Sequence, residues 1–123
     1  MGGCCGAFKM NIFTRNKELN FTEENIESLT KSVTELKIIL NEIGTSLGQQ
    51  ELTYVLASAM KKDAELFKKY VLTNELFGGA GALWELFCGN NYLQSEFQNK
   101  FNNFCRDLIK IGIKNRRIKQ VMW

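Results

Sequence analysis

Apolar residues recur every three or four positions in two long stretches of this 123-residue chain. An α-helix turns once every 3.6 residues, so this spacing places the apolar side chains on one helical face. The two sets are Ile26, Leu29, Val33, Leu36, Leu40 and Ile43, and Leu93, Phe97, Phe101, Phe104, Leu108 and Ile111. Each apolar face has to be buried against another element, so the chain is predicted to fold as packed helices.

The residues that flank these stretches indicate where the helices begin and end. Thr22 is a good N-cap, and the carboxylates of Glu23 and Glu24 suit the positive end of a helix dipole. Gly44 stands where a left-handed C-cap is needed, which predicts a helix over 23–43. Gly112 is the natural stop of the second helix, predicted over 93–111.

In the middle of the chain the residues that mark helix ends are less clear. A third apolar face is expected over 46–72, formed by Leu52, Val55, Leu56, Ala59, Met60, Phe67 and Val71. Thr45 or Ser46 can cap its start, and the segment is either one helix or two, with Asp63 capping the second. The apolar run over 83–87 predicts a further short helix that ends at Gly89.

We therefore predict an all-α, single-domain bundle of four or five helices. The length is typical of one domain. Residues 1–20 are expected to form an N-terminal arm, and residues 113–123 a basic C-terminal segment. A short strand or extended arm at the termini is an alternative, because apolar residues alternate over 8–12 and again over 109–113, and two such strands could pair.

The chain contains no histidine and four cysteines. The usual general base and the commonest metal ligand are thus missing, and the cysteine spacing does not match a zinc site. Cys88 and Cys105 stand beside phenylalanines, where neutral buried thiols are expected. The carboxylates form no defensible catalytic pair, so we expect a protein that is not an enzyme and has no metal site and no cofactor.

No uncharged apolar run approaches the roughly 18 residues that a membrane-spanning helix requires. Residues 1–7 do not show a basic region followed by an apolar one, as a secretory signal would. A cytoplasmic location with reduced cysteines is the expectation.

A glycine-rich stretch runs from Phe77 to Trp84 and is the most distinctive motif of the chain. Its candidate binding residues are Gly78, Gly79, Gly81, Trp84 and Phe87. Glycines before a helix can present amides to a phosphate, but the Lys-Ser or Lys-Thr of a phosphate-binding loop is missing after Gly81. Close packing, with Trp84 and Phe87 as anchors, is the favoured interpretation, and a recognition surface is the alternative.

The positive charge is concentrated near the C-terminus. Residues 1–60 carry five basic and seven acidic side chains, whereas residues 61–123 carry eleven and six. The candidate binding residues here are Lys114, Arg116, Arg117 and Lys119. They could neutralise phosphates while Tyr92 or Trp123 stacks on a base. A solvated segment that suits the negative end of the preceding helix is the simpler interpretation.

The N-terminus offers a third candidate site. Gly2 followed by Cys4 and Cys5 is similar to the start of dually acylated proteins, in which a second lipid makes membrane attachment stable. Gly6 departs from that pattern, which has Ser or Thr at this position. Membrane attachment is therefore expected only if the chain is acylated, and the added acyl mass would be visible by mass spectrometry of the native protein.

The function predicted from these features is a non-catalytic protein-interaction or regulatory module. Its partner would be another protein or a second copy of the chain. Binding of nucleic acid or of an anionic surface through the basic C-terminal segment is the first alternative. Membrane anchoring by acylation is the second.

Overall fold

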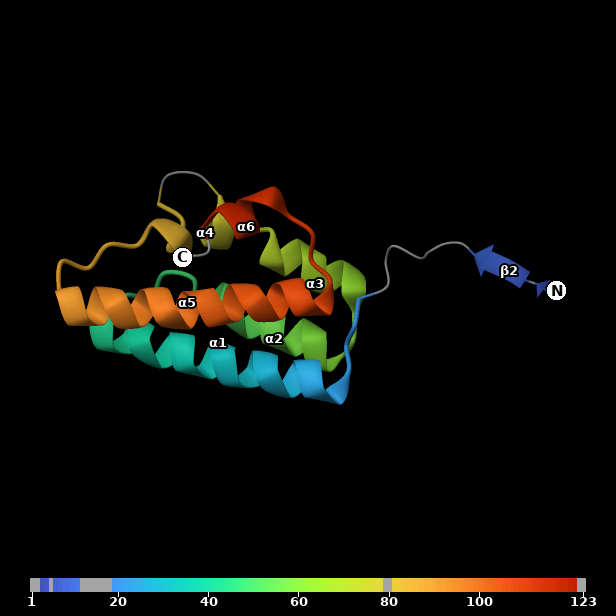
Figure 1. Cartoon of the computed structure of the whole chain (residues 1–123), viewed down its shortest axis with the longest axis horizontal. Helices are drawn as coiled ribbons and strands as arrows, with labels where there is room; N and C mark the ends of the chain where they lie inside the picture. The colour runs from blue at the N-terminus through green and yellow to red at the C-terminus, as the bar shows by residue number, and fades with distance from the viewer. Residues whose placement is uncertain (1–2, 5, 12–18, 79–80, 122–123) are drawn as a thin grey trace.

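Two 21-residue helices, α1 (Glu23–Ile43) and α5 (Asn91–Ile111), lie side by side and form the frame of the protein (Figure 1). The computed structural model describes residues 3–4, 6–11, 19–78 and 81–121, with side chains described over 19–78 and 81–119. The helices of this part of the chain pack into one all-α domain, which confirms the predicted fold class.

Both frame helices begin and end as predicted to within two residues. The Thr22 side chain accepts a hydrogen bond from the Asn25 amide at 3.1 Å, and Gly44 ends α1 in the left-handed conformation with φ 92°. The Asn90 side chain caps α5 through the Leu93 amide at 2.9 Å. Local capping chemistry therefore sets these boundaries.

The segment 46–72 forms two helices, α2 (Gln49–Met60) and α3 (Ala64–Val71). Asp63 caps the second through the Leu66 amide at 3.1 Å. The predicted N-caps of the first, Thr45 and Ser46, are wrong. Gly48 takes that position with φ 76°, and glycine suits it because a Cβ there would lie 3.0 Å from the Leu83 side chain.

Met60 was expected on the apolar face of this segment, and that prediction is wrong. Its side chain is 57% exposed, because α2 ends at Met60 and the chain turns at Lys61 and Lys62. The turn carries Lys62 at φ 57°, after which Asp63 starts the next helix.

The predicted helix over 83–87 is reduced to the 3₁₀ turn η2 (Leu83–Glu85), and a four-residue helix, α4 (Asn74–Phe77), precedes it. The Gln94 side chain explains the difference. It accepts from the Cys88 amide at 2.9 Å and donates to the Leu86 carbonyl at 3.0 Å, which holds residues 86–88 in a non-helical course. With α6 (Arg116–Val121), the described residues form six α-helices, two of them very short.

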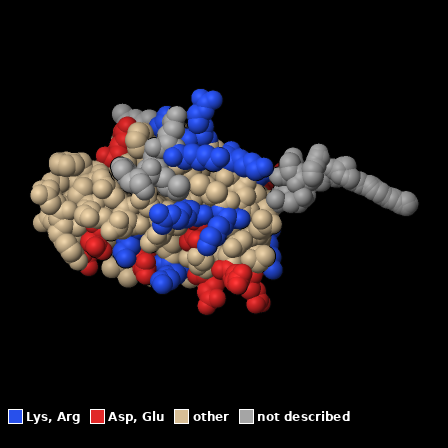
Figure 2. All heavy atoms as spheres, viewed as in Figure 1, with Lys and Arg blue, Asp and Glu red and all other residues tan. Residues whose placement is uncertain are grey.

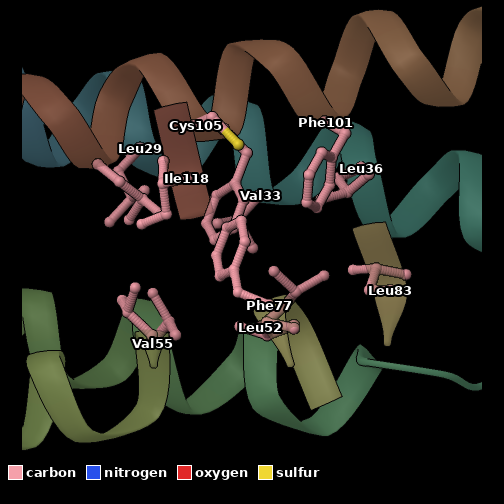
Figure 3. Packing of buried hydrophobic residues seen from close by; sticks show 14 of the residues in the cluster. Leu29, Val33, Leu36, Leu52, Val55, Phe77, Leu83, Phe101, Cys105 and Ile118 are labelled. Carbon is pink, nitrogen blue, oxygen red and sulfur yellow. The ribbon is translucent and has the colours of Figure 1, made fainter. Parts of the chain in front are cut away.

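The core lies between the α1/α5 pair and the layer formed by α2, α3 and α4 (Figure 3). Its centre is a cluster of four phenylalanines whose ring centroids lie 5.5 to 6.4 Å apart: Phe77, Phe97, Phe101 and Phe104. Ile118 of α6 and Leu83 of η2 are fully buried against the same core. The aromatic stripe of α5 is thus intramolecular core, as expected.

The N-terminal strands β1 (Gly3–Cys4) and β2 (Gly6–Asn11) pair with each other in parallel, and Figure 1 places β2 away from the helices. The alternative of a strand over 109–113 is wrong. Ile109 and Ile111 belong to α5, which continues until Gly112 ends it. Among the helices of the described residues, none is both long and apolar enough to cross a membrane.

Replacing a core phenylalanine should destabilise the protein far more than replacing an exposed one. We expect Phe104→Ala to lower the free energy of unfolding by about 3–5 kcal/mol, since it leaves a cavity in the aromatic cluster. Phe87→Ala is the matched control, because that ring is 78% exposed, and it should change stability by less than about 0.5 kcal/mol. Urea unfolding measures both, and similar losses would contradict the assignment of the core.

Candidate functional site

Two sequence-predicted sites that are far apart in the chain meet at the carbonyl of Gly78. The Trp84 indole N–H donates to this oxygen at 2.8 Å, and the Arg117 guanidinium donates to it at 3.1 Å. The same guanidinium lies 5.1 Å from the centroid of the Trp84 ring, within reach of a cation–π interaction. The glycine-rich stretch and the basic segment are therefore joined by Arg117.

The glycines serve local geometry at this junction. A Cβ on Gly78 would lie 2.6 Å from backbone atoms of Asn74, so no other residue fits there without movement of α4. Gly81 has φ 88° and its amide donates to the Glu85 carboxylate at 3.1 Å. Gly78 thus contributes an acceptor carbonyl, opposite to the amide donors that a phosphate-binding loop needs. Gly79 lies outside the described residues.

Phe87 does not anchor this junction, and that prediction is wrong. Its ring is 78% exposed because Gln94 holds the preceding backbone in a non-helical course. Leu83 is fully buried in the core and Trp84 is half-buried under Arg117. The three side chains therefore form no continuous exposed apolar patch.

The basic segment begins with a sharp turn between α5 and α6. Gly112 ends α5 with φ 123°, and a Cβ at this position would lie 3.2 Å from the Leu19 side chain. The Asn115 side chain then accepts from the Arg117 amide at 2.8 Å and caps α6. Ile118 points into the core, so Arg116 and Lys119, three positions apart on α6, are left exposed.

These elements enclose a pocket of about 460 Å³ that we call the basic pocket. It is lined by Ile109, Gly112, Ile113, Lys114, Asn115, Arg116 and Lys119. Its lining combines two isoleucines with three cations and contains no acidic residue. Of the ion pairs formed by the described residues, none involves Lys114, Arg116 or Lys119. Figure 2 shows Lys and Arg gathered over α6 and the C-terminal part of α5.

The rest of the predicted nucleic-acid site does not converge on this pocket. Arg117 is turned toward Gly78 and Trp84 and does not line the pocket. Tyr92 is in the first turn of α5, about 25 Å from Ile109 along the helix axis. Trp123 lies outside the described residues. No described aromatic ring lines the basic pocket.

A polar groove of about 250 Å³ runs between α1 and α5 and was missed by the sequence reasoning. Asp107 is buried in it and accepts a hydrogen bond from the Ser28 hydroxyl at 2.7 Å. Lys31, Arg106 and Lys110 also line the groove. In the sequence, Asp107 falls between Phe104 and Leu108, on the side of α5 that the apolar pattern predicts to be buried. A carboxylate at such a position could have indicated this groove.

A second groove between the same helices, about 240 Å³ in volume, was also missed. We call it the acidic groove, and it is lined by Glu35, Ile38, Ile39, Glu42, Tyr92, Glu96 and Lys100. Lys100 pairs with Glu35 at 3.6 Å, whereas Glu42 and Glu96 form no ion pair with another residue that the structure describes. Tyr92 is 69% exposed and Ile38 is 53% exposed. The sequence signal is weak, because the residues come from helices that are some 60 positions apart in the chain.

Cys105 is fully buried beside the phenylalanine cluster, as expected, and burial raises the pKa of its thiol from 9.0 to about 12. Cys88 is only half-buried in the loop before α5, contrary to expectation, because residues 86–88 are not helical. Of the candidate acylation residues, Gly2 and Cys5 lie outside the described residues, and Cys4 is in β1.

Within the described part of the chain, no three cysteine or carboxylate side chains are grouped so that they could hold a metal ion. Comparison with protein-family models, with curated proteins and with solved structures finds no match to this chain. The functional argument therefore depends on the geometry of the described surfaces.

Arg117 should contribute measurably to stability through Gly78 and Trp84. We expect Arg117→Ala to lower the free energy of unfolding by about 1–2 kcal/mol, since a charged hydrogen bond and a cation–π contact are lost together. Arg116→Ala removes a neighbouring exposed cation and should cost less than about 0.5 kcal/mol. Thermal and urea unfolding compare the two variants, and equal losses would disprove the junction.

The Cys105 thiol should make stability fall at alkaline pH. The unfolded thiol ionises above pH 9, while the folded thiol keeps its proton up to about pH 12, so the unfolded state binds fewer protons in this window. The free energy of unfolding should therefore fall by roughly 1 kcal/mol per pH unit between these values. Cys105→Ala should remove this part of the slope and Cys88→Ala should keep it; identical slopes in both variants would refute the effect.

Proposed function

We propose that the protein is a non-catalytic protein-interaction module that binds an acidic, amphipathic segment of a partner protein in the basic pocket. The observation that supports this most directly is the composition of the pocket. Lys114, Arg116 and Lys119 surround an apolar floor of Ile109 and Ile113, without an acidic residue among the lining side chains. Such a site can bury an apolar side chain while neighbouring carboxylates contact the cations.

A protein partner fits this pocket better than a nucleic acid does. Lys114, Arg116 and Lys119 could each donate to a phosphate, but single-stranded bases are held largely by stacking on aromatic rings. The pocket offers isoleucine side chains in place of aromatic rings, and the half-buried Trp84 is already covered by Arg117. An apolar floor contributes to binding only if the ligand brings an apolar group.

An anionic membrane surface is also less well matched. Peripheral proteins insert protruding apolar side chains between lipid headgroups, and each nearby cation adds about 1 kcal/mol. In the basic pocket the apolar floor is recessed, with Ile113 only 4% exposed. A recessed floor receives a side chain and does not penetrate a bilayer. Acylation at Gly2, Cys4 and Cys5 stays a separate hypothesis, and a cytoplasmic location is part of the present proposal.

Charge reversal at the pocket should weaken the binding of an acidic amphipathic peptide. The probe is a synthetic peptide of alternating glutamate and leucine, titrated into the full chain by isothermal calorimetry. We expect the double variant Lys114→Glu, Lys119→Glu to bind it at least about tenfold more weakly, since attraction becomes repulsion at a partly desolvated site. The matched control, Lys61→Glu with Lys69→Glu, has the same net charge and should bind like the original chain.

Single-stranded DNA and vesicles containing anionic phospholipid serve as competing probes in the same titration. Tighter binding of either one than of the peptide, lost in the pocket variant, would reject the protein-partner proposal in favour of that ligand class. No binding of the peptide at low salt would also reject it, because surface charge attraction is strongest there.

A further inference from the structure

The acidic groove and the basic pocket have opposite charge, and each combines charged with apolar side chains. The groove exposes Tyr92 and Ile38 beside the carboxylates of Glu42 and Glu96, which have no ion-pair partner in the described part of the chain. The pocket holds a recessed apolar floor among Lys114, Arg116 and Lys119, in which Ile109 is half-buried and Ile113 is buried. The groove side therefore carries the chemistry that the proposed function requires of a partner: protruding apolar side chains flanked by acids.

We propose that the partner is a second copy of this chain, whose acidic groove docks on the basic pocket of the first. This inference rests on the proposed function, since it uses the same pocket and names its occupant. In the complex, Tyr92 of one copy contacts Ile109 and Ile113 of the next. Glu42 and Glu96 then lie near the cations of the pocket.

The acidic groove and the basic pocket of one molecule are too far apart to contact each other. Glu96 and Ile109 are thirteen residues apart on the same straight helix, α5, which separates them by about 20 Å along its axis. Each molecule thus presents one acidic and one basic surface at different places. Contact between such surfaces is head to tail, because the patch used by one copy differs from the patch used by the other.

The charges that would carry the contact form no ion pair among the described residues of the monomer. Glu35 has its partner in Lys100, but Glu42 and Glu96 form no ion pair with any described residue. The same holds for the three cations of the pocket. Contact between two copies would pair both sets, and the exposed Tyr92 and Ile38 side chains would be removed from water in the same step.

Head-to-tail contact has a consequence for assembly size. If the rotation between successive copies closes, the product is a ring; if it does not, the product is an open chain that grows with concentration. In both cases the contact depends on exposed charges, so added salt should weaken it. The mean mass in solution is therefore the direct readout.

The first experiment measures mass by analytical ultracentrifugation of the full chain from micromolar to millimolar concentration. We expect a mean mass of at least about twice the protomer mass at low salt, falling toward the protomer mass at high salt as the charges are screened. A protomer mass at every concentration at low salt would overturn the proposal. So would an association that added salt strengthens.

The second experiment uses two complementary charge-reversed variants. One is Lys114→Glu with Lys119→Glu, and the other is Glu42→Lys with Glu96→Lys. All four side chains are at least partly exposed, so both variants should keep the helical circular dichroism of the original chain. Each variant alone should be a monomer, because one surface of every contact has the wrong sign. An equimolar mixture should associate, since the acidic groove of the first variant meets the basic pocket of the second.

The control Lys61→Glu with Lys69→Glu should associate like the original chain. If it becomes monomeric as well, net charge and not the pocket governs association, and the proposal is wrong. A mixture that stays monomeric would also overturn it. A monomeric chain that still binds the glutamate–leucine peptide in the basic pocket would refute self-association alone, whereas failure to bind that peptide as well would refute the proposed function too.

Discussion

The packing of α1 against α5 is the interaction on which the rest of the structure depends. Each helix presents one long apolar face, and the phenylalanines of α5 extend past α1 to reach Phe77 and the layer below (Figure 3). The short elements α4, η2 and α6 are each held by one or two buried side chains on this frame, such as Leu76, Leu83 and Ile118. Helices of four to six residues are not stable in isolation, so their positions follow from the frame.

The same packing determines where charge is displayed. Burial of Ile118 orients α6, which turns Arg117 toward Gly78 and Trp84 and leaves Arg116 and Lys119 outside. The pairing of α1 with α5 likewise brings Glu42 of one helix near Glu96 of the other at the rim of one groove. The two charged surfaces are therefore products of core packing, although none of their charged residues is in the core.

Local patterns were sufficient to predict the long helices, both caps of α1, the end of α5 at Gly112 and the buried face of α5, because these features depend on residues within one or two turns of each other. They failed where a distant side chain decides the conformation. Gln94 hydrogen-bonds residues 86 and 88 in a non-helical conformation, and the Leu83 side chain lies where a Cβ at position 48, the N-cap of α2, would be. The sequence identified the cations of the basic pocket as candidate binding residues. It did not predict the apolar floor or the contact of Arg117 with Gly78 and Trp84, because both depend on residues that only the fold brings together.

The net charge of +3 describes this molecule poorly, because its charges are segregated. Figure 2 shows the cations over α6 and the end of α5, while acidic side chains gather where α1 begins. A protein with segregated charge is oriented by the electrostatic field of its partner before the two make contact. The same charge repels partners whose surface has the same sign. Charge alone contributes little affinity at exposed sites, where a surface ion pair adds about 0–1 kcal/mol. A binding surface on this fold therefore needs an apolar component beside its charges, and the basic pocket and the acidic groove both combine the two.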